Sequence, residues 1–575
     1  MKKILISRWT VAYLLLFLLS LILRFYHLNL PLLDDREAAV ALKAISGSSS
    51  FIVGLSGEPG LTSILSLVLS VFGKNETTAR LVSAIFGSAI ICVPFLFRKT
   101  LGKETAYILS ILLMFDPGLI AFSRQVNGAV LSICGLLFAA GFLINKKYIP
   151  AGIAGGIALL GSPILWPGLL ALGLTLWLSG FGKEKLFAPA TDEETLAAPE
   201  SRVSLLNGII ALVATILVVG TAFFTRPAGL SAPLINLTAY FKGWTISSDF
   251  SFILFLSSFI LYQPVALIFG LYEGIKGNAN SDRVATFLLR WFLISVLLAV
   301  IYPSKEMDSL VISFIPLLAL FAKFIYGVWE SIEMPDLAAF GLMALTLLLV
   351  PFAWMNAIVL RFPLEGQDDT LRLAAVVGGL VLLLMSFILI RFGWPPKQAE
   401  VGLFLGFAIL SCIFSFSTAW RAAGLGKYPQ AELWKYDGVV DEMDLLLKTT
   451  GDLSEWNRTS RQGIDVVVVN YPSPSLLWAL RDYTNVGEDR YLPVSSNPSI
   501  AITAAEKIPA LAEAYRGQDI VLFKKTSWSL ILPEEWIKWY AFREVPQEKQ
   551  QVILWARTDL FPGAAKPIPA AIIQP

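Results

Sequence analysis

The chain has 575 residues, of which 56% are hydrophobic and only 15% are charged, with a formal net charge of +2. Soluble proteins carry about 25% charged residues, so the composition indicates a membrane protein, and the small net charge argues against a nucleic-acid partner. The three cysteines all lie in apolar stretches, and His27 is the one histidine. We therefore expect no disulfide framework, no His-rich metal site and no Ser-His-Asp triad.

Thirteen apolar stretches follow one another up to residue 420, and each is interpreted as a membrane span. The predicted spans are 9–26, 79–98, 104–122, 128–145, 147–162, 164–181, 204–224, 249–271, 285–302, 308–327, 338–360, 373–392 and 400–420. The residues Lys2, Lys3 and Arg8 precede the first stretch, and no small-x-small cleavage pattern follows it. The first span is therefore predicted to be retained rather than cleaved as a signal peptide. The protein is expected in the plasma membrane, with its N-terminus in the cytoplasm.

An odd number of spans places the two ends of the chain on opposite sides of the membrane. Basic loops at 97–104, 145–147 and 391–397 all fall on the predicted cytoplasmic side, in agreement with that count. The sequence thus predicts a polytopic α-helical membrane domain over residues 1–420, with an outward first loop at 27–78. Residues 421–575 are predicted to form an extracytoplasmic soluble domain.

The C-terminal region has the pattern of a small α/β domain. Strand-like runs occur at 464–470, 519–525 and 551–557, and helix-like runs lie between them at 474–483 and 533–542. Neither a catalytic triad nor a Gly-rich phosphate-binding loop is present in this region, so chemistry is expected elsewhere.

The first loop carries the acidic cluster Asp34, Asp35, Arg36 and Glu37 at the start of a stretch rich in helix formers. We expect an interfacial helix over 35–45, capped by Asp34 or Asp35, and a second interfacial helix over 61–73. A plain explanation is a solvated helix start, where acids suit the helix dipole. The functional explanation is a general base or a pair of ligands for a divalent cation.

The same loop holds Glu58 before a Pro-Gly turn, in the motif GEPGL at 57–61. This second acidic position favours the functional explanation. The order of motifs then resembles that of the membrane glycosyltransferases of the GT-C fold, in particular glycosyltransferase family 39, the protein O-mannosyltransferases and the lipid A aminoarabinose transferases. The acidic cluster is followed by VFGKNETTARLVSAIFG at 71–87, MFDPGLIAFSRQ at 114–125 and a charged link with a Pro-containing span at 302–320.

The resemblance implies a polyisoprenyl-phosphate sugar as donor and a glycan, lipid or protein as acceptor, at the outer face of the membrane. Asp34 or Asp35 would deprotonate the acceptor hydroxyl, and Glu37 and Glu58 would orient the acceptor or a divalent cation. The leaving phosphate would be held by basic residues near the interface. The substrate-binding candidates are Arg124, Arg226 and Lys305, with Asp116 as a partner of Arg124.

Some positions depart from the family pattern. The acidic motif is interrupted by Arg36, an acid precedes the Pro-Gly turn, and Ala129 stands where many members have Asp. These departures favour a second hypothesis, a non-catalytic or flipping-associated relative that binds or presents lipid-linked glycans. The runs at 476–486 and 514–525 resemble the outer domain of such relatives. A secondary transporter is a third alternative, but paired broken helices in two halves are not evident in the sequence.

Overall fold

In a computed structural model, the structure describes residues 8–46, 58–180, 199–248, 250–331, 334–362, 369–492, 496–505, 513–528 and 531–561. Lys2, Lys3 and residues 47–57 of the predicted outward loop lie outside these ranges. The helical part comprises α1 (Arg8–Phe25), α2 (Asp35–Ser46), α3 (Pro59–Phe72), α4 (Glu76–Ala89), α5 (Val93–Leu96), α6 (Arg98–Leu101), α7 (Lys103–Met114), α8 (Pro117–Ser123), α9 (Ala129–Ile144), α10 (Tyr148–Leu160), α11 (Leu165–Leu178), α12 (Pro199–Val218), α13 (Ala232–Gly243), α14 (Phe252–Tyr262), α15 (Pro264–Ala279), α16 (Arg283–Ile301), α17 (Ser309–Ser331), α18 (Leu337–Arg361), α19 (Asp369–Gly393) and α20 (Pro396–Trp420).

Among the described residues, seven helices are long and apolar enough to cross a membrane, or up to nine if two bent pairs each count as one span. The predicted count of thirteen is therefore not confirmed. The pairs α7–α8 and α14–α15 bend by 57° and 92°, and each second helix begins with a proline, which cannot continue the preceding helix. The other four predicted spans fall in α9, α10, α11 and the apolar part of α12, Val203–Val218. Each of these apolar helices is shorter than the roughly 20 residues that a bilayer requires.

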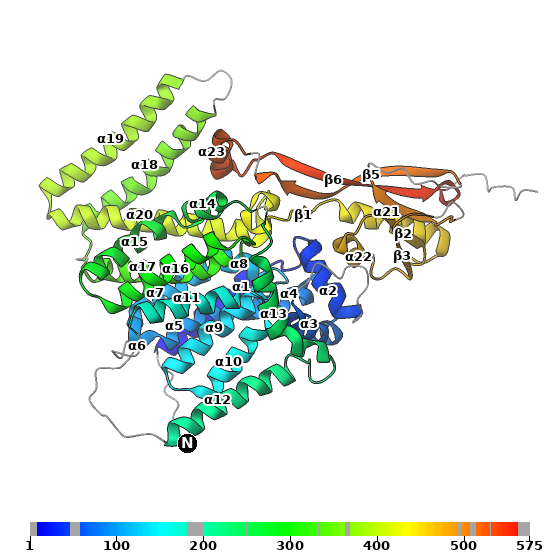
Figure 1. The fold of residues 1–575 in the computed structure, drawn as a ribbon. Helices are drawn as coiled ribbons and strands as arrows, with labels where there is room; N and C mark the ends of the chain where they lie inside the picture. Colours follow the sequence, from blue (N-terminus) through cyan, green and yellow to red (C-terminus); the bar gives the residue numbers. More distant parts are fainter. Residues whose placement is uncertain are drawn as a thin grey trace, which may run out of the picture.

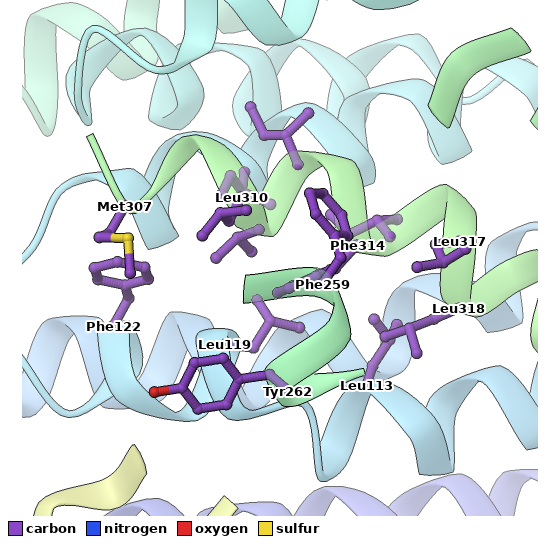
Figure 2. Close-up of a cluster of buried hydrophobic side chains, with 14 of the residues drawn as sticks. Leu113, Leu119, Phe122, Phe259, Tyr262, Met307, Leu310, Phe314, Leu317 and Leu318 are labelled. Carbon is purple, nitrogen blue, oxygen red and sulfur yellow. The ribbon is translucent and has the colours of Figure 1, made fainter. Parts of the chain in front are cut away.

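A large apolar core joins α7, α8, α14 and the Pro-containing α17. Figure 2 shows the α17 side chains Leu310, Phe314, Leu317 and Leu318 facing residues of those three helices. The rings of Phe259 and Phe314 meet edge to face, with centroids 5.0 Å apart. Helices α18, α19 and α20 pack mainly on one another and lie to one side of the bundle (Figure 1).

The C-terminal part contains a six-stranded mixed sheet in the order β1-β5-β6-β4-β2-β3. Its elements are β1 (Val439–Val440), α21 (Met443–Arg458), β2 (Asp465–Val469), α22 (Pro474–Ala479), β3 (Asn485–Asp489), β4 (Ile500–Ala504), β5 (Tyr515–Thr526), α23 (Pro533–Phe542) and β6 (Gln547–Arg557). Strand β2 pairs in parallel with β3 and β4, whereas β6 pairs antiparallel with β4 and β5. The predicted strands and helices are confirmed, while α21 and the strands β1, β3 and β4 were missed.

The segment between α20 and β1 is inserted between the helical bundle and the sheet. Trp434 is 3% exposed, and its ring packs against Phe122, Tyr262 and Phe314. The neighbouring Glu432 forms a buried ion pair with Arg543, which directly follows α23, at 2.8 Å. Figure 1 shows α22 next to α2, so the C-terminal part also contacts the first loop.

The first loop is helical as predicted: α2 begins at Asp35 and α3 begins at Pro59. Asp34 caps α2, because its Oδ1 accepts a hydrogen bond from the Glu37 amide at 2.9 Å. The start of the loop is fixed by Arg80 of α4, whose guanidinium donates to the carbonyls of Leu28, Pro31 and Leu32.

Candidate functional site

A buried network of four charges holds the acidic cluster. Glu37 is 2% exposed and forms a bidentate pair with Arg80, with distances of 2.8 and 2.7 Å. Lys435 of the inserted segment lies 3.2 Å from the same carboxylate, and the Val126 amide donates to it at 2.9 Å. Burial alone would raise the pKa of Glu37, but the charges of Arg80 and Lys435 lower it to about 2.

Asp34 belongs to this network through Lys435, whose Nζ lies 3.0 Å from Oδ2. Burial raises the pKa of Asp34, while the ammonium group of Lys435 opposes that shift. One oxygen of Asp34 caps α2 and the other pairs with Lys435, so this carboxylate joins α2 to the segment between α20 and β1.

Asp35 is directed towards the C-terminal part of the chain. Its Oδ1 accepts hydrogen bonds from the Ser473 hydroxyl at 2.8 Å and from the Ser475 amide at 2.9 Å. Thus Asp35 fastens the loop before α22 to the start of α2. None of the three acids predicted to be catalytic, Asp34, Asp35 or Glu37, lines the cavity described next.

A cavity of about 240 Å³ lies between the first loop and helices α13, α16 and α17. Its polar and charged lining comes from sequence regions far apart, and Leu298 and Ile312 contribute an apolar wall. The lining residues are Arg36, Glu58, Ser162, Pro163, Ile164, Pro167, Ala239, Tyr240, Ser295, Leu298, Ala299, Tyr302, Ser304, Glu306, Asp308, Ser309 and Ile312.

Glu58 is the predicted acidic residue that reaches this cavity. Its Oε2 accepts a hydrogen bond from the Gly128 amide at 3.0 Å, which fixes the carboxylate. A Cβ on Gly128 would lie only 3.0 Å from that carboxylate, so glycine permits the close approach. Burial raises the pKa of Glu58 to about 7, although Arg36 and the Gly128 amide act in the opposite direction.

Arg36 and two acids from the link before α17 complete the charged lining. Arg36 pairs with Glu306 at 2.9 Å, and both side chains are about half exposed, at 49% and 48%. Asp308 is buried, and burial together with the charge of Glu306 raises its pKa to about 7. The cavity thus combines one guanidinium with three carboxylic acids, two of which have pKa values near neutrality.

The predicted phosphate-binding residues do not gather in the cavity. Arg124 is 4% exposed and donates to the main-chain carbonyls of Arg24, Tyr26, His27 and Ala423. These contacts join α1 and α8 to the segment that follows α20, and Arg124 is not among the residues that line the cavity.

The remaining predicted residues lie at several places. Asp116 is buried, caps α8 by accepting from the Leu119 amide, and accepts from Gln263 at 2.9 Å, so both of its oxygens have partners other than Arg124. Arg226 donates weakly to the Lys43 carbonyl at the end of α2, at 3.3 Å. Lys305 lies in the link that carries Glu306, and within the described part of the chain its side chain has no ion-pair partner.

Sequence reasoning missed four residues that organise this region. Arg80, Glu306 and Asp308 all occur within motifs that carried the family resemblance, but they had been given no role. Lys435 had no local signal, because its partners lie 401 and 398 residues away. Within the described residues, no group of three metal-ligating side chains is arranged to hold a metal ion.

Comparisons with known proteins agree with this architecture. Residues 58–161 match the family model of dolichyl-phosphate-mannose-protein mannosyltransferase. ArnT from Cupriavidus metallidurans bound to undecaprenyl phosphate aligns with a TM-score of 0.50 and 14% identity, covering 96% of this chain and 98% of that chain. The apo state of the same ArnT aligns with a TM-score of 0.49 and 14% identity, covering 95% and 97%. No curated protein sequence matches the chain.

The fold therefore defines a polytopic membrane protein of the GT-C type, as the sequence resemblance predicted. More particularly, the region from Glu58 to the end of α10 carries the mannosyltransferase-type family signature.

Proposed function

We propose that this protein is a glycosyltransferase that moves a sugar from a polyisoprenyl-phosphate donor to an acceptor hydroxyl on the outer face of the plasma membrane. The observation that carries the proposal is Glu58, a fixed carboxylate with a pKa of about 7 that lines a cavity beside Arg36. A general base acts best when its pKa lies near the working pH. The family match and the GT-C fold support the same reaction class.

In this mechanism Glu58 takes the place that the sequence had given to Asp34 or Asp35. Its carboxylate removes the proton of the acceptor hydroxyl, whose oxygen attacks the anomeric carbon of the donor sugar. The bond from that carbon to the phosphate oxygen breaks, and polyisoprenyl phosphate leaves with the electron pair. A single displacement of this kind inverts the anomeric configuration.

The charges of the cavity suit a singly charged phosphodiester donor. Arg36 offers a planar fork of donors to the phosphate, and Lys305 lies in the adjoining link. Glu58 and Asp308, each with a pKa of about 7, are partly neutral at physiological pH, which reduces their repulsion of the anion. The apolar side chains Leu298 and Ile312 offer contact to the first isoprene units.

The test compares Glu58→Gln with Glu104→Gln, a matched change of an exposed acid at the start of α7. Both purified variants are assayed for transfer from a radiolabelled polyprenyl-phosphate sugar and for polyprenyl-phosphate binding. Glu58→Gln should lose about 10²–10⁴-fold in rate and retain binding, because a general base contributes that factor. Transfer at the wild-type rate would refute the role of Glu58.

A second candidate is a non-catalytic relative that binds or presents lipid-linked glycans. It is favoured by the acids of the family motif, since Asp34 and Glu37 are held in ion pairs and Asp35 is held by a serine loop. This candidate expects the wild-type protein to bind polyprenyl phosphate while giving no transfer with any acceptor. The same assay therefore separates the two functions.

A further inference from the structure

A second, larger cleft lies where the first loop meets the C-terminal part of the chain. Its volume is about 380 Å³, within the range of small-ligand sites. One wall comes from the first loop and α4, and the other comes from α21, α22 and the adjoining turns. The lining residues are Leu32, Leu33, Glu76, Val440, Met443, Asp444, Leu447, Gly451, Arg461, Gln462, Ser475, Trp478, Ala479, Arg481, Asp482 and Tyr483.

One side of the cleft is fixed by contacts among its own residues. The indole of Trp478 donates to Glu76 at 3.0 Å, and the guanidinium of Arg481 lies over the Trp478 ring at 4.4 Å. Arg481 also lies 3.5 Å from Glu76. Because these side chains satisfy one another across the two parts of the chain, the wall is preorganised and needs no ligand to complete it.

Other polar side chains in the lining remain free to bind. Gln462, Tyr483 and Asp444 have no side-chain hydrogen bond to any residue in the described ranges. The Tyr483 hydroxyl lies 3.7 Å from the position of a Cβ on Gly451, so it is close to the bare face of α21. An amide, a phenol and a carboxylate provide both donors and acceptors, next to the apolar Leu447.

The charge of the cleft selects against anionic ligands. Three acids and two arginines line it, and Arg461 is paired outside it with Asp452 at 2.8 Å. The lining has no surplus of cationic side chains to bind a phosphate. Glu76 and Asp482 both lie within 4.0 Å of the Arg481 guanidinium, at 3.5 and 3.9 Å. Two arginines against three acids leave the lining with a formal charge of −1, which disfavours anions. The carboxylate, amide and phenol groups beside apolar surface can all bond the hydroxyl groups of a neutral polyhydroxylated ligand.

The cleft and the Glu58 cavity lie next to each other at the start of α2. Leu33 lines the cleft and Arg36 lines the cavity, so the two sites are separated by three residues, or at most about 11 Å of chain. Asp35 lies between these two residues in the sequence. Its carboxylate accepts a hydrogen bond from the main-chain amide of Ser475, another residue of the cleft lining, at 2.9 Å. Asp35, which does not line the Glu58 cavity, thus positions the wall of the second site.

We propose that this cleft binds the neutral oligosaccharide part of the acceptor and presents its reacting hydroxyl towards Glu58. This inference rests on the proposed transferase function, because it assigns the acceptor side of the same reaction. It also gives the C-terminal part a role in the choice of acceptor.

The experiment measures sugar binding to the full-length protein in detergent by saturation-transfer NMR. The probes are mannobiose, lactose and N,N′-diacetylchitobiose, with glucose 6-phosphate and glucosamine as charged comparators. Gly451→Phe fills the cleft, and Gly451→Ala is its matched control, since a Cβ there meets only ordinary contacts of 3.6 Å or more. Tyr483→Phe removes one hydroxyl, and Tyr491→Phe is its control, at a residue that is 77% exposed and does not line the cleft.

At least one neutral disaccharide should bind, at least 10-fold more weakly to Gly451→Phe than to Gly451→Ala. Tyr483→Phe should weaken binding about 2- to 10-fold, the effect of one hydrogen bond, and Tyr491→Phe should leave it unchanged. Binding of none of the neutral disaccharides, a preference for a charged probe, or equal binding by both Gly451 variants would overturn the inference. Glu58→Gln should bind sugar normally, so a loss of transfer in that variant with intact sugar binding reports on the proposed function alone.

Discussion

Lys435→Met should destabilise the attachment of the inserted segment to the first loop. The change removes the ammonium group that lies 3.0 Å from Asp34 and 3.2 Å from Glu37, in a site where all three side chains are buried. Glu37 keeps its bidentate pair with Arg80, but Asp34 loses its ion-pair partner. Removal of one partner from a buried pair costs about 3–5 kcal/mol, because the other charge remains uncompensated.

The pH dependence has a defined sign. Burial already raises the pKa of Asp34, and Lys435 opposes that shift, so the pKa of Asp34 rises further in Lys435→Met. A carboxyl whose folded-state pKa is raised contributes stability below its unfolded pKa and loses it as pH rises through the folded pKa. The deficit in Tm relative to wild type should therefore be large at pH 8 and shrink as the pH is lowered towards 5.

The assay is the Tm of the purified protein across that pH range for wild type, Lys435→Met, Asp34→Asn and the double variant. The neutral Asn in the double variant removes the unpaired charge, so it should recover most of the loss. Lys435→Arg, which keeps the charge, should be closer to wild type than Lys435→Met. A Tm deficit in Lys435→Met that is independent of pH and is not relieved by Asp34→Asn would refute the reasoning.

The other predictions concern the cavity, the bundle and the topology. The transfer rate should rise with pH through a value of about 7, as the Glu58 carboxyl loses its proton, and initial rates from pH 5.5 to 9 measure this; a flat profile would contradict a role for this base. Arg124→Ala should lower the Tm, because four main-chain carbonyls lose their donor, yet leave polyprenyl-phosphate affinity unchanged, and a loss of affinity would restore Arg124 as a phosphate ligand. A reporter that fluoresces only in the cytoplasm, fused after Pro575, should remain dark, and a bright fusion would place the C-terminal part inside.

Local patterns were sufficient for some of the elements, though not for α21, β1, β3 and β4. The strand-like run at 464–470 and the helix-like run at 533–542 predicted a strand and a helix that the structure contains as β2 and α23. Asp34 before a helix-forming run predicted its own cap, because capping depends on residues within one turn. The family motifs likewise predicted a GT-C fold, since they record the order of segments along the chain.

Tertiary structure decided which acid faces the cavity. Asp34, Asp35 and Glu37 look equivalent in the sequence, but Arg80, Lys435 and the Ser473 loop arrive from distant segments and occupy all three. Glu58 remains in the cavity because Gly128, 70 residues away, leaves room for its carboxylate. Similarly, Arg124 was predicted to bind phosphate, and in the structure it donates to main-chain carbonyls of α1 and of the segment after α20, partners that its own motif does not indicate. The partner of each buried charge depends on how segments distant in the sequence pack together. The spacing of residues within one segment carries no information about that packing.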